Sequence, residues 1–191
     1  GQEVRAHLKD IARVRPPDAL AERLAVLKGE RKRVRLDTAT AAMWLWQRLG
    51  GARGRISEAA DPCILPKARK NEAEIRGTRV AHQRDGVAMV RFLAWLDREA
   101  PKGTVDEITA VRTLEAMRAE TQALKEISFD TISGSGPNGA IVHYRVTEAT
   151  NRRLQQGELF LVDSGAQFID GTTDITRTVA ISAPTAEMRD R

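Results

Sequence analysis

The sequence has little cysteine and no long hydrophobic run. Its single cysteine, Cys63, cannot form an internal disulfide, which fits a reducing compartment and predicts a cytoplasmic protein. No apolar stretch approaches the ~20 residues that a membrane-spanning helix needs, and residues 1–10 are too polar for a signal peptide. We therefore expect no membrane partner.

Aromatic residues are also scarce. They make up 4% of the 191 residues, so a platform on which nucleic-acid bases could stack is poorly supplied. The chain carries 31 Lys and Arg against 26 Asp and Glu, a net charge of +5, but these positive residues are spread out except at 28–35 and 67–70. This distribution is typical of a solvated surface, and we expect no nucleic-acid partner.

What the chain does contain is a mixture of helical and strand patterns, which predicts an α/β (α+β) fold. Residues 1–62 read as helix, strand, helix and strand, a block that is short for a domain with its own core. Pro62 and Pro66 favour extended backbone and interrupt helices. We therefore predict a domain boundary at residue 62 and a second domain over residues 63–191.

Two long helices are predicted in the second domain. Asn71 and Glu74 have the spacing of a capping box, and apolar residues at three- and four-residue steps continue the helix to about residue 99. Gly86 lies inside this helix, where glycine costs ~1 kcal/mol relative to alanine, and its presence indicates close packing at that point. Thr104 and Glu107 form a second capping-box pattern, which opens the next helix.

The most informative stretch is a predicted β-hairpin. An apolar run over residues 159–162 predicts a strand that ends on Asp163, and a second strand rich in Thr, Ile and Val is expected over residues 172–181. Asp170-Gly171 between them is a strong signal for a hairpin turn, because glycine accepts the positive φ that such a turn requires. The sequence therefore predicts two antiparallel strands joined by a tight turn.

Asp163 and Asp174 lie at these strands and are the candidate metal ligands. A carboxylate at the end of a buried strand needs hydrogen-bond donors or a cation, and paired carboxylates suit a hard divalent cation. With Asp170-Gly171 as a two-residue loop, both side chains share one face but lie roughly 13 Å apart along the strands at ~3.3 Å per residue. A shared metal requires a bulge or a longer loop that shifts the register, and we predict one near the turn. The alternative is that local amides bind these carboxylates, as is common for Asp in turns.

A glycine-rich segment and a histidine form the third feature. Residues 133–139 contain three glycines and are expected to form a loop, with a short strand over residues 141–144 behind it. No Lys-Ser/Thr pair or helix follows, so a phosphate-binding loop is poorly supported, and glycine would instead let the backbone approach a site closely. His143 would then point from the strand end into that site, although a lone histidine on an apolar strand is more often structural.

Several segments in the same order resemble the pita-bread metallopeptidases, and specifically their aminopeptidase P branch. The matching segments are KARKNEAE (67–74), AHQRDGVA (81–88), SGSGPNGAIVHY (133–144), DSGAQ (163–167) and GTTDITRT (171–178). The resemblance implies that residues 63–191 are the first half of a pita-bread catalytic domain. It also implies that residues 1–62 are the end of the creatinase-type, non-catalytic α/β domain that precedes it.

The resemblance further implies a hydrolase with two divalent metal ions, usually Mn²⁺, with Zn²⁺ or Co²⁺ as alternatives. Such an enzyme removes the first residue of a peptide whose second residue is proline. The aspartate matching Asp163 binds one metal, and the aspartate matching Asp174 bridges both. His143 matches a histidine that contacts the substrate and helps to stabilise the tetrahedral intermediate. A homodimer is compatible with this family.

The family's remaining metal ligands, a histidine and two glutamates, belong to a second half that should follow Ala183, whereas this sequence ends at Arg191. We therefore expect the parent protein to be an Xaa-Pro aminopeptidase and the 191-residue chain alone to be catalytically silent. Two alternatives stay open. One is a prolidase-type dipeptidase, and the other is a non-catalytic pita-bread module that binds peptides without metal.

Overall fold

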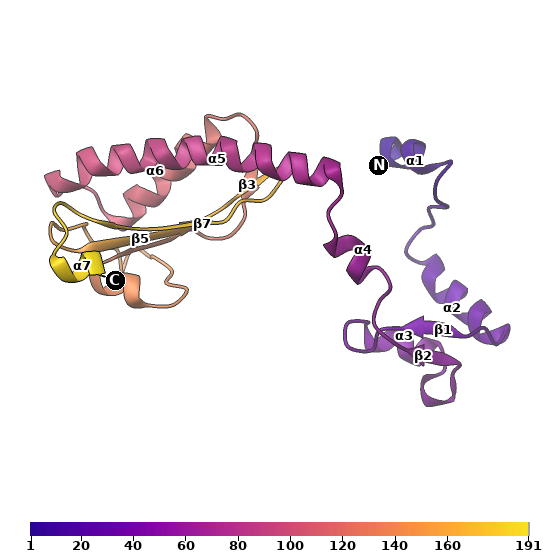
Figure 1. Cartoon of the computed structure of the whole chain (residues 1–191). Coiled ribbons are helices and arrows are strands. Elements are labelled where there is room, and N and C mark those ends of the chain that lie inside the picture. Colours follow the sequence, from indigo (N-terminus) through magenta and orange to yellow (C-terminus); the bar gives the residue numbers. More distant parts are fainter. Residues whose placement is uncertain (191) are drawn as a thin grey trace. The chain divides into compact units, whose positions relative to one another are not determined.

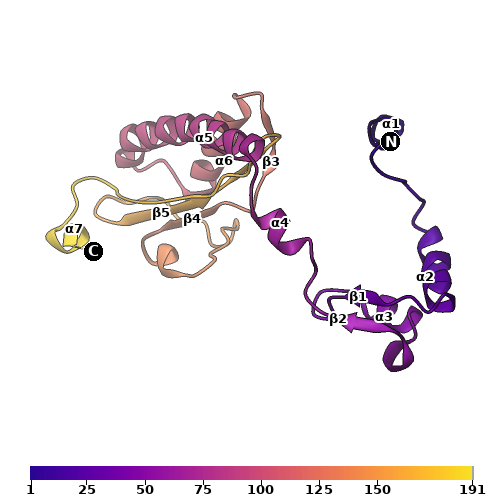
Figure 2. The same cartoon turned by 45° about the vertical axis from the view of Figure 1, so that its right-hand side comes forward.

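The computed structural model describes residues 1–190, which form two compact units. The first unit ends at Arg69 and the second begins at Lys70. Figures 1 and 2 show the helices and strands of each unit from two directions. None of the helices in the described part of the chain is long and apolar enough to cross a membrane.

The first unit contains a parallel pair of short strands and several short helices. Its elements are α1 (Gln2–Leu8), α2 (Ala19–Gly29), β1 (Val34–Leu36), α3 (Met43–Arg48), the 3₁₀ turn η1 (Gly51–Arg53), β2 (Ile56–Glu58) and α4 (Ile64–Ala68). β1 and β2 pair in parallel, with Val34 opposite Ile56, and α3 lies in the connection that a parallel pair requires. Few large side chains are buried here: Leu24 and Leu49 are the buried hydrophobic ones among the described residues of this unit.

The division between the units lies beyond the two prolines that indicate a domain boundary in the sequence. Pro66 does not keep the backbone extended, because it lies in the first turn of α4. An N–H at that position has no partner within the helix, so its absence costs little there. α4 therefore belongs to the first unit, which runs to Arg69.

The second unit consists of two long helices packed on antiparallel strands. Its elements are α5 (Glu72–Glu99), η2 (Ala100–Lys102), α6 (Glu107–Ala119), β3 (Leu124–Ile127), β4 (Ile132–Ser135), η3 (Gly136–Ala140), β5 (Leu159–Ser164), β6 (Ala166–Phe168), β7 (Ile175–Ala180) and α7 (Ala186–Asp190). The three-stranded sheet has the order β4-β5-β7, and β3 pairs with β6. Figure 1 shows α5 running along one side of these strands. The mixed helix-and-strand class predicted from the sequence is confirmed.

The core of the second unit joins α5 and α6 to the three-stranded sheet. Phe92, Leu96, Leu114, Phe160 and Val162 are each at most 2% exposed and belong to one hydrophobic cluster. The two residues from α5 are four apart, and the two from β5 are two apart. These are the spacings that place side chains on one face of a helix and one face of a strand.

Helix α5 begins as the sequence predicts, whereas α6 does not. Asn71 Oδ1 accepts from Glu74 N at 2.9 Å, and Glu74 Oε2 accepts from Asn71 N at 2.8 Å, which confirms the capping box. The cap of α6 is Asp106, whose Oδ1 accepts from Thr109 N at 2.7 Å. The predicted second capping box is wrong, because Glu107 is fully buried and its carboxylate binds other groups.

Close packing on α5 occurs at Gly77, not at Gly86 as predicted. A Cβ added at Gly86 would meet nothing within 4 Å. A Cβ added at Gly77 would collide with the carbonyl oxygen of Asp170, in the turn between β6 and β7. The helix approaches that turn so closely that only glycine fits at this point.

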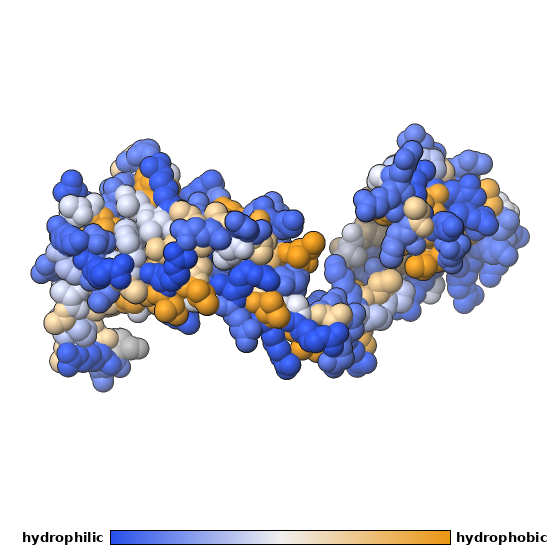
Figure 3. All heavy atoms as spheres, turned by 90° about the horizontal axis from the view of Figure 1, so that it is seen from above, coloured by the Kyte–Doolittle hydropathy of each residue, from blue (hydrophilic) through white to orange (hydrophobic). Residues whose placement is uncertain are grey.

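Hydrophobic side chains at the surface are distributed in small groups. Blue, hydrophilic residues cover most of the face in Figure 3, and orange, hydrophobic ones occur between them. Val80, Val87 and Val90 of α5 are among the exposed hydrophobic residues, at 46%, 62% and 66% exposure. Exposed apolar side chains of this kind are common on folded proteins and need no partner to explain them.

Candidate metal centre

The hairpin that carries the two aspartates has the same register on both sides of them. Asp163 of β5 lies opposite Thr176 of β7, and closer to the turn Gln167 lies opposite Thr172. Four residues separate the two pairs on each strand, so no extra residue is inserted between them. The predicted bulge or longer loop near the turn is therefore wrong, although the register is shifted, since Asp163 lies opposite Thr176 and not Thr178.

The turn itself lies one residue earlier than predicted. Phe168 N donates to Gly171 O at 2.9 Å, which encloses Ile169 and Asp170 as a two-residue loop. Gly171 is not among the residues with positive φ. A Cβ at Gly171 would instead lie 3.0 Å from the Cβ of Ala81 in α5. Gly171 therefore serves the close packing of the hairpin on α5 and not the geometry of the turn.

The earlier turn brings the two aspartates closer along the strands. Thr173 N donates to Ala166 O at 2.9 Å, so in the same register Asp174 follows opposite Gly165. Asp174 is displaced from Asp163 by two residues, roughly 7 Å at ~3.3 Å per residue. An even displacement also leaves both side chains on one face. Diagonal neighbours of this kind lie within about 7–8 Å, which two carboxylates can span through a cation.

The two carboxylates have different surroundings. Asp163 is half-buried, and its Oδ1 is buried with no hydrogen-bond partner among the described residues. Asp174 is exposed. A buried carboxylate oxygen without a donor is costly, and a divalent cation at this point would offset that cost. The alternative that local amides bind these carboxylates therefore fails for Asp163 Oδ1, which accepts no hydrogen bond from the described residues.

His143 lies in a turn and is exposed. The strand predicted over residues 141–144 is wrong, since His143 has a φ of +54°, a left-handed conformation that strands do not contain. Across residues 1–190, no group of three or more His, Cys, Asp or Glu side chains is placed to hold a metal ion. The structure therefore brings Asp163 and Asp174 to one face and does not add His143 to them as a third ligand.

The glycine-rich segment before His143 is more ordered than the sequence predicts. A loop is expected over residues 133–139, whereas the first of these residues form the end of β4 and the rest form η3. Gly134 lies where the two elements cross, because a Cβ there would be 2.7 Å from the Cα of Gly139. Glycine here permits the backbone to fold closely onto itself.

Glu107 anchors this segment, and it is a residue that the sequence reasoning does not identify. Its buried carboxylate accepts from Ser135 N at 2.7 Å and from the Tyr144 hydroxyl at 3.0 Å. Asn138 Nδ2 and Arg152 N each donate to it at 3.0 Å. Burial raises the pKa of Tyr144, and the Glu107 carboxylate adds to this effect, so the phenol remains a donor. The residues around Glu107 carry no sequence signal for this role, because its partners lie 28 to 45 residues further along the chain.

Helix α5 also holds the hairpin turn through an ion pair. The Arg84 guanidinium donates to the two carboxylate oxygens of Asp170 at 2.9 and 3.1 Å, and it lies 5.0 Å from the ring centroid of Phe168. The hydrogen bonds from Arg84 lower the pKa of Asp170 and raise the pKa of Arg84. Asp170 is therefore a structural residue of the turn and not a third metal ligand.

Two sequence profiles divide the chain in the same order as the two units. The profile of the creatinase/prolidase N-terminal domain matches residues 1–74, and the profile of metallopeptidase family M24 matches residues 76–191. The chain belongs to metallopeptidase family M24. The fold implied by the resemblance is thus confirmed: residues that match the M24 pita-bread domain follow residues that match a creatinase-type N-terminal domain.

The curated relatives of this M24 chain include Xaa-Pro aminopeptidases. A probable Xaa-Pro aminopeptidase P of Aspergillus flavus is 38% identical over 191 residues, which are 96% of this chain and 29% of that protein. An Xaa-Pro aminopeptidase of Drosophila melanogaster is 46% identical over 132 residues, which are 69% of this chain and 21% of that protein. The chain therefore spans less than a third of the length of these relatives.

Solved structures show the same M24 fold. The X-prolyl aminopeptidase of Caenorhabditis elegans, described as a cytosolic enzyme with a di-nuclear active site, has a TM-score of 0.82 at 30% identity, over 98% of this chain and 32% of that one. A Xaa-Pro dipeptidase of Bacillus anthracis has a TM-score of 0.71 at 21% identity, over 89% of this chain and 46% of that one. The latter likeness shows the fold alone, so the fold does not separate aminopeptidases from prolidases.

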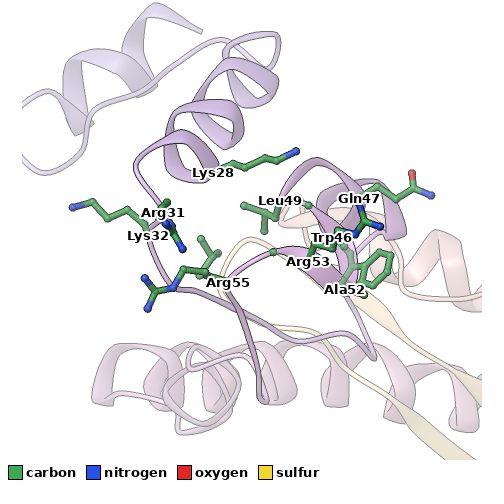
Figure 4. A pocket seen from close by; sticks show the side chains of 13 residues that line it. Lys28, Arg31, Lys32, Trp46, Gln47, Leu49, Ala52, Arg53 and Arg55 are labelled. Carbon is green, nitrogen blue, oxygen red and sulfur yellow. The ribbon is translucent and has the colours of Figure 1, made fainter.

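A hollow in the first unit has the wrong charge for a metal cation. Its volume is about 790 Å³, and Figure 4 shows that Lys28, Arg31, Lys32, Arg53 and Arg55 are among the side chains that line it. Its described lining residues include no Asp or Glu. Like charges disfavour a divalent cation at this place, so the carboxylate pair of the second unit is the candidate metal centre of this M24 chain.

Proposed function

We propose that the whole protein carrying this chain is an Xaa-Pro aminopeptidase, which releases the first residue of peptides with proline at position two. The observation that carries this proposal is the carboxylate pair. Asp163 has a buried oxygen without a partner, and the hairpin register puts it on one face with Asp174. The names of the relatives that are 38% and 46% identical support the substrate class.

The carboxylate pair is proposed to hold two divalent cations, Mn²⁺ first, with Zn²⁺ or Co²⁺ as alternatives. Asp163 would bind one cation and Asp174 would bridge both. When bound, two close divalent ions lower the pKa of a shared water and polarise the scissile carbonyl. Support comes from the hard oxygen donors of the pair and from the di-nuclear active site described for the C. elegans enzyme.

His143 is proposed to contact the peptide substrate. Its imidazole is exposed, and the next residue, Tyr144, is tied to Glu107 by a hydrogen bond of 3.0 Å. The anchored Tyr144 limits the movement of the neighbouring backbone, and the exposed imidazole of His143 is accessible to a substrate. A hydrogen bond from His143 to the developing oxyanion would help to stabilise the tetrahedral intermediate.

The 191-residue chain alone is proposed to be inactive. It supplies two carboxylates, whereas a dinuclear centre requires more oxygen and nitrogen ligands. We further propose a cytoplasmic protein without nucleic-acid or membrane partners, with a homodimer as the assembly to be tested. The single cysteine and the cytosolic enzyme of C. elegans support the location.

The test compares the whole protein with the 191-residue chain on a tripeptide that has proline at position two. With Mn²⁺, the whole protein should release the first residue, and Asp163→Asn or Asp174→Asn should abolish that release because each removes an ionised ligand. Asp97→Asn changes an exposed α5 residue that lies beside the end of β7 remote from Asp174, at residues 179–181. It is the matched control and should keep full activity. Release by the 191-residue chain, or full activity in Asp163→Asn, would contradict the proposal.

The two alternatives predict different results with the same material. A prolidase-type dipeptidase would hydrolyse Xaa-Pro dipeptides and leave longer peptides intact. A metal-free peptide-binding module would take up no Mn²⁺ in calorimetry on the whole protein. The unpartnered oxygen of Asp163 favours the metal-dependent functions over the module.

A further inference from the structure

Thr173 directly precedes Asp174, and each of its polar groups is bound. Its hydroxyl donates to Asp85 Oδ2 at 2.6 Å and accepts from Ala166 N at 3.0 Å. Its amide donates to Ala166 O at 2.9 Å, and its carbonyl oxygen accepts from Ser128 Oγ at 3.2 Å. Thr173 is 1% exposed. The backbone that carries Asp174 is therefore fixed from α5, from β6 and from the segment that follows β3.

The Thr173 hydroxyl takes the place of a backbone acceptor in the hairpin ladder. In a regular antiparallel pair, two opposite residues exchange both N–H···O bonds. Here Ala166 N donates to the hydroxyl, and the Thr173 carbonyl faces Ser128 instead. A Cβ at Gly165 would collide with that carbonyl oxygen and with Ser128 Oγ. The position opposite Asp174 must therefore be glycine, and the backbone departs from regular pairing next to the two carboxylates.

Behind Thr173, the Asp85 carboxylate is paired with Arg118 inside the core. Both residues are 0% exposed. Arg118 Nε donates to Asp85 Oδ1 at 2.6 Å, and Arg118 Nη2 donates to Asp85 Oδ2 at 3.0 Å. A buried ion pair is often no more stabilising than an apolar replacement of similar volume. Stability alone therefore does not explain why the core contains this ion pair. A specific explanation is that Arg118 fixes the Asp85 carboxylate, which in turn orients the Thr173 hydroxyl.

We propose that the Arg118–Asp85 pair positions Asp174 for metal binding by fixing the Thr173 hydroxyl. The proposal rests on the proposed metal centre and assigns to the pair no contact with metal or substrate. Arg118 orients the Asp85 carboxylate, Asp85 holds the Thr173 hydroxyl, and the backbone at Thr173 sets the place of Asp174 diagonal to Asp163. Removal of residues that orient a metal ligand typically weakens metal affinity by about 10- to 100-fold.

The test uses Mn²⁺ as the probe and the isotope-labelled 191-residue chain. Mn²⁺ is paramagnetic and broadens the amide signals of residues close to it, even when it binds weakly. Wild type should show broadening at Asp163 and Asp174, and Asp174→Asn should lose it. Thr173→Val removes the hydroxyl but keeps the shape, and it should raise the Mn²⁺ concentration for half-maximal broadening by about 10-fold or more.

Two further variants show whether the hydroxyl itself is responsible. Thr173→Ser keeps the hydroxyl and should stay within about twofold of wild type, since the ligand remains oriented. Thr178→Val makes the same chemical change at an exposed residue of β7 and should leave Mn²⁺ binding unchanged. A change of side-chain volume alone would weaken Mn²⁺ binding in Thr173→Ser as well, whereas loss of the hydroxyl occurs only in Thr173→Val.

The outcomes separate this proposal from the proposed function. If wild type shows no broadening at Asp163 and Asp174 in millimolar Mn²⁺, these two carboxylates do not bind metal in this chain and the positioning role is overturned here, whereas the proposed function is judged by the activity of Asp163→Asn and Asp174→Asn in the whole protein. If wild type binds Mn²⁺ and Thr173→Val binds it equally well, the centre stands and the positioning role is overturned. If the amide spectrum shows that Thr173→Val does not fold, Ser128→Ala carries the test, because it releases only the Thr173 carbonyl. It should weaken Mn²⁺ binding in the same direction if the Thr173 backbone sets the place of Asp174. Asp85→Asn tests the pair directly, since it keeps the shape and removes the carboxylate charge that Arg118 orients and that holds the Thr173 hydroxyl. Mn²⁺ binding unchanged in Asp85→Asn would overturn the positioning role.

Discussion

At the residue scale, replacement of glycine by alanine should change stability in opposite directions at two positions of α5. A Cβ at Gly77 would collide with the Asp170 carbonyl oxygen, whereas a Cβ at Gly86 would meet nothing within 4 Å. Gly86→Ala should therefore raise the free energy of unfolding by about 0.5–1 kcal/mol, because alanine has the better helix propensity. Gly77→Ala should lower it by about 1–3 kcal/mol, the usual cost of overpacking. Urea denaturation followed by circular dichroism measures both, and effects of the same sign would contradict the packing described here.

Glu107 provides a second test at the residue scale. Its carboxylate accepts from four donor groups, and a glutamine would direct an NH₂ group at some of them. Glu107→Gln should lower the free energy of unfolding by about 2–3 kcal/mol, since buried donors lose their acceptor. Glu120→Gln is the control, because Glu120 forms an exposed ion pair with Arg91 and should change stability by less than about 1 kcal/mol. Equal losses in the two variants, measured by urea denaturation, would argue against the anchoring role of Glu107.

The burial of Asp85, Glu107 and Arg118 could not be predicted from the sequence. Each lies on a helix with a regular apolar pattern, in which charged residues normally face solvent. Their partners, among them Thr173 and Ser135, come from strands far along the chain. A local pattern contains no information about such partners. The identities of Asp163 and Asp174 as candidates, by contrast, follow from residue type and strand position.

At the scale of elements, the ion pair between α5 and the hairpin turn has a pH dependence of known sign. The hydrogen bonds from Arg84 lower the pKa of Asp170 in the folded chain. Its stabilising contribution is therefore fully present above the unfolded-state pKa, about 3.9, and is lost as pH falls through the lower folded-state pKa. Asp170→Asn should be less stable than wild type at neutral pH, and the two should converge as pH falls below about 4.

Urea midpoints of wild type and Asp170→Asn across this pH range measure the effect. The comparison isolates Asp170, because all other carboxylates titrate in both proteins. Protection of the Phe168 amide, which donates to Gly171 O across the turn, should fall in parallel. A difference between the two proteins that stays constant with pH would rule out a contribution from the ionised Asp170 carboxylate.

The elements differ in how far the sequence predicts them. The start of α5 follows from Asn71 and Glu74 alone, because a capping box is formed within four residues. The hairpin turn is misplaced by one residue, because Gly171 is read as a turn glycine. Its actual role, contact with Ala81 across the hairpin–helix interface, depends on tertiary packing. Because the turn lies one residue earlier, the separation of the two aspartates along the strands is roughly 7 Å and not the predicted separation of roughly 13 Å.

At the scale of the whole molecule, the two units have very different cores. The hydrophobic residues buried in the described part of the first unit are Leu24 and Leu49, whereas the second unit has the extended cluster around Phe92 and Phe160. Burial of apolar surface is the main stabilising term of a folded unit. The sequence predicts this contrast, since the first block is short for an independent core.

Unfolding of the 191-residue chain should therefore occur in two steps, with the first unit unfolding at the lower urea concentration. The tryptophans allow the steps to be separated: Trp44 and Trp46 lie in the first unit and Trp95 in the second. In Trp95→Phe, which keeps an aromatic ring beside Phe92, fluorescence reports on the first unit alone. Its midpoint should precede that of far-UV circular dichroism, which is dominated by the 28 residues of α5 and the 13 of α6. Coincident midpoints would instead show one cooperative transition. The first unit would then not unfold independently of the second, and the prediction of two steps would be wrong.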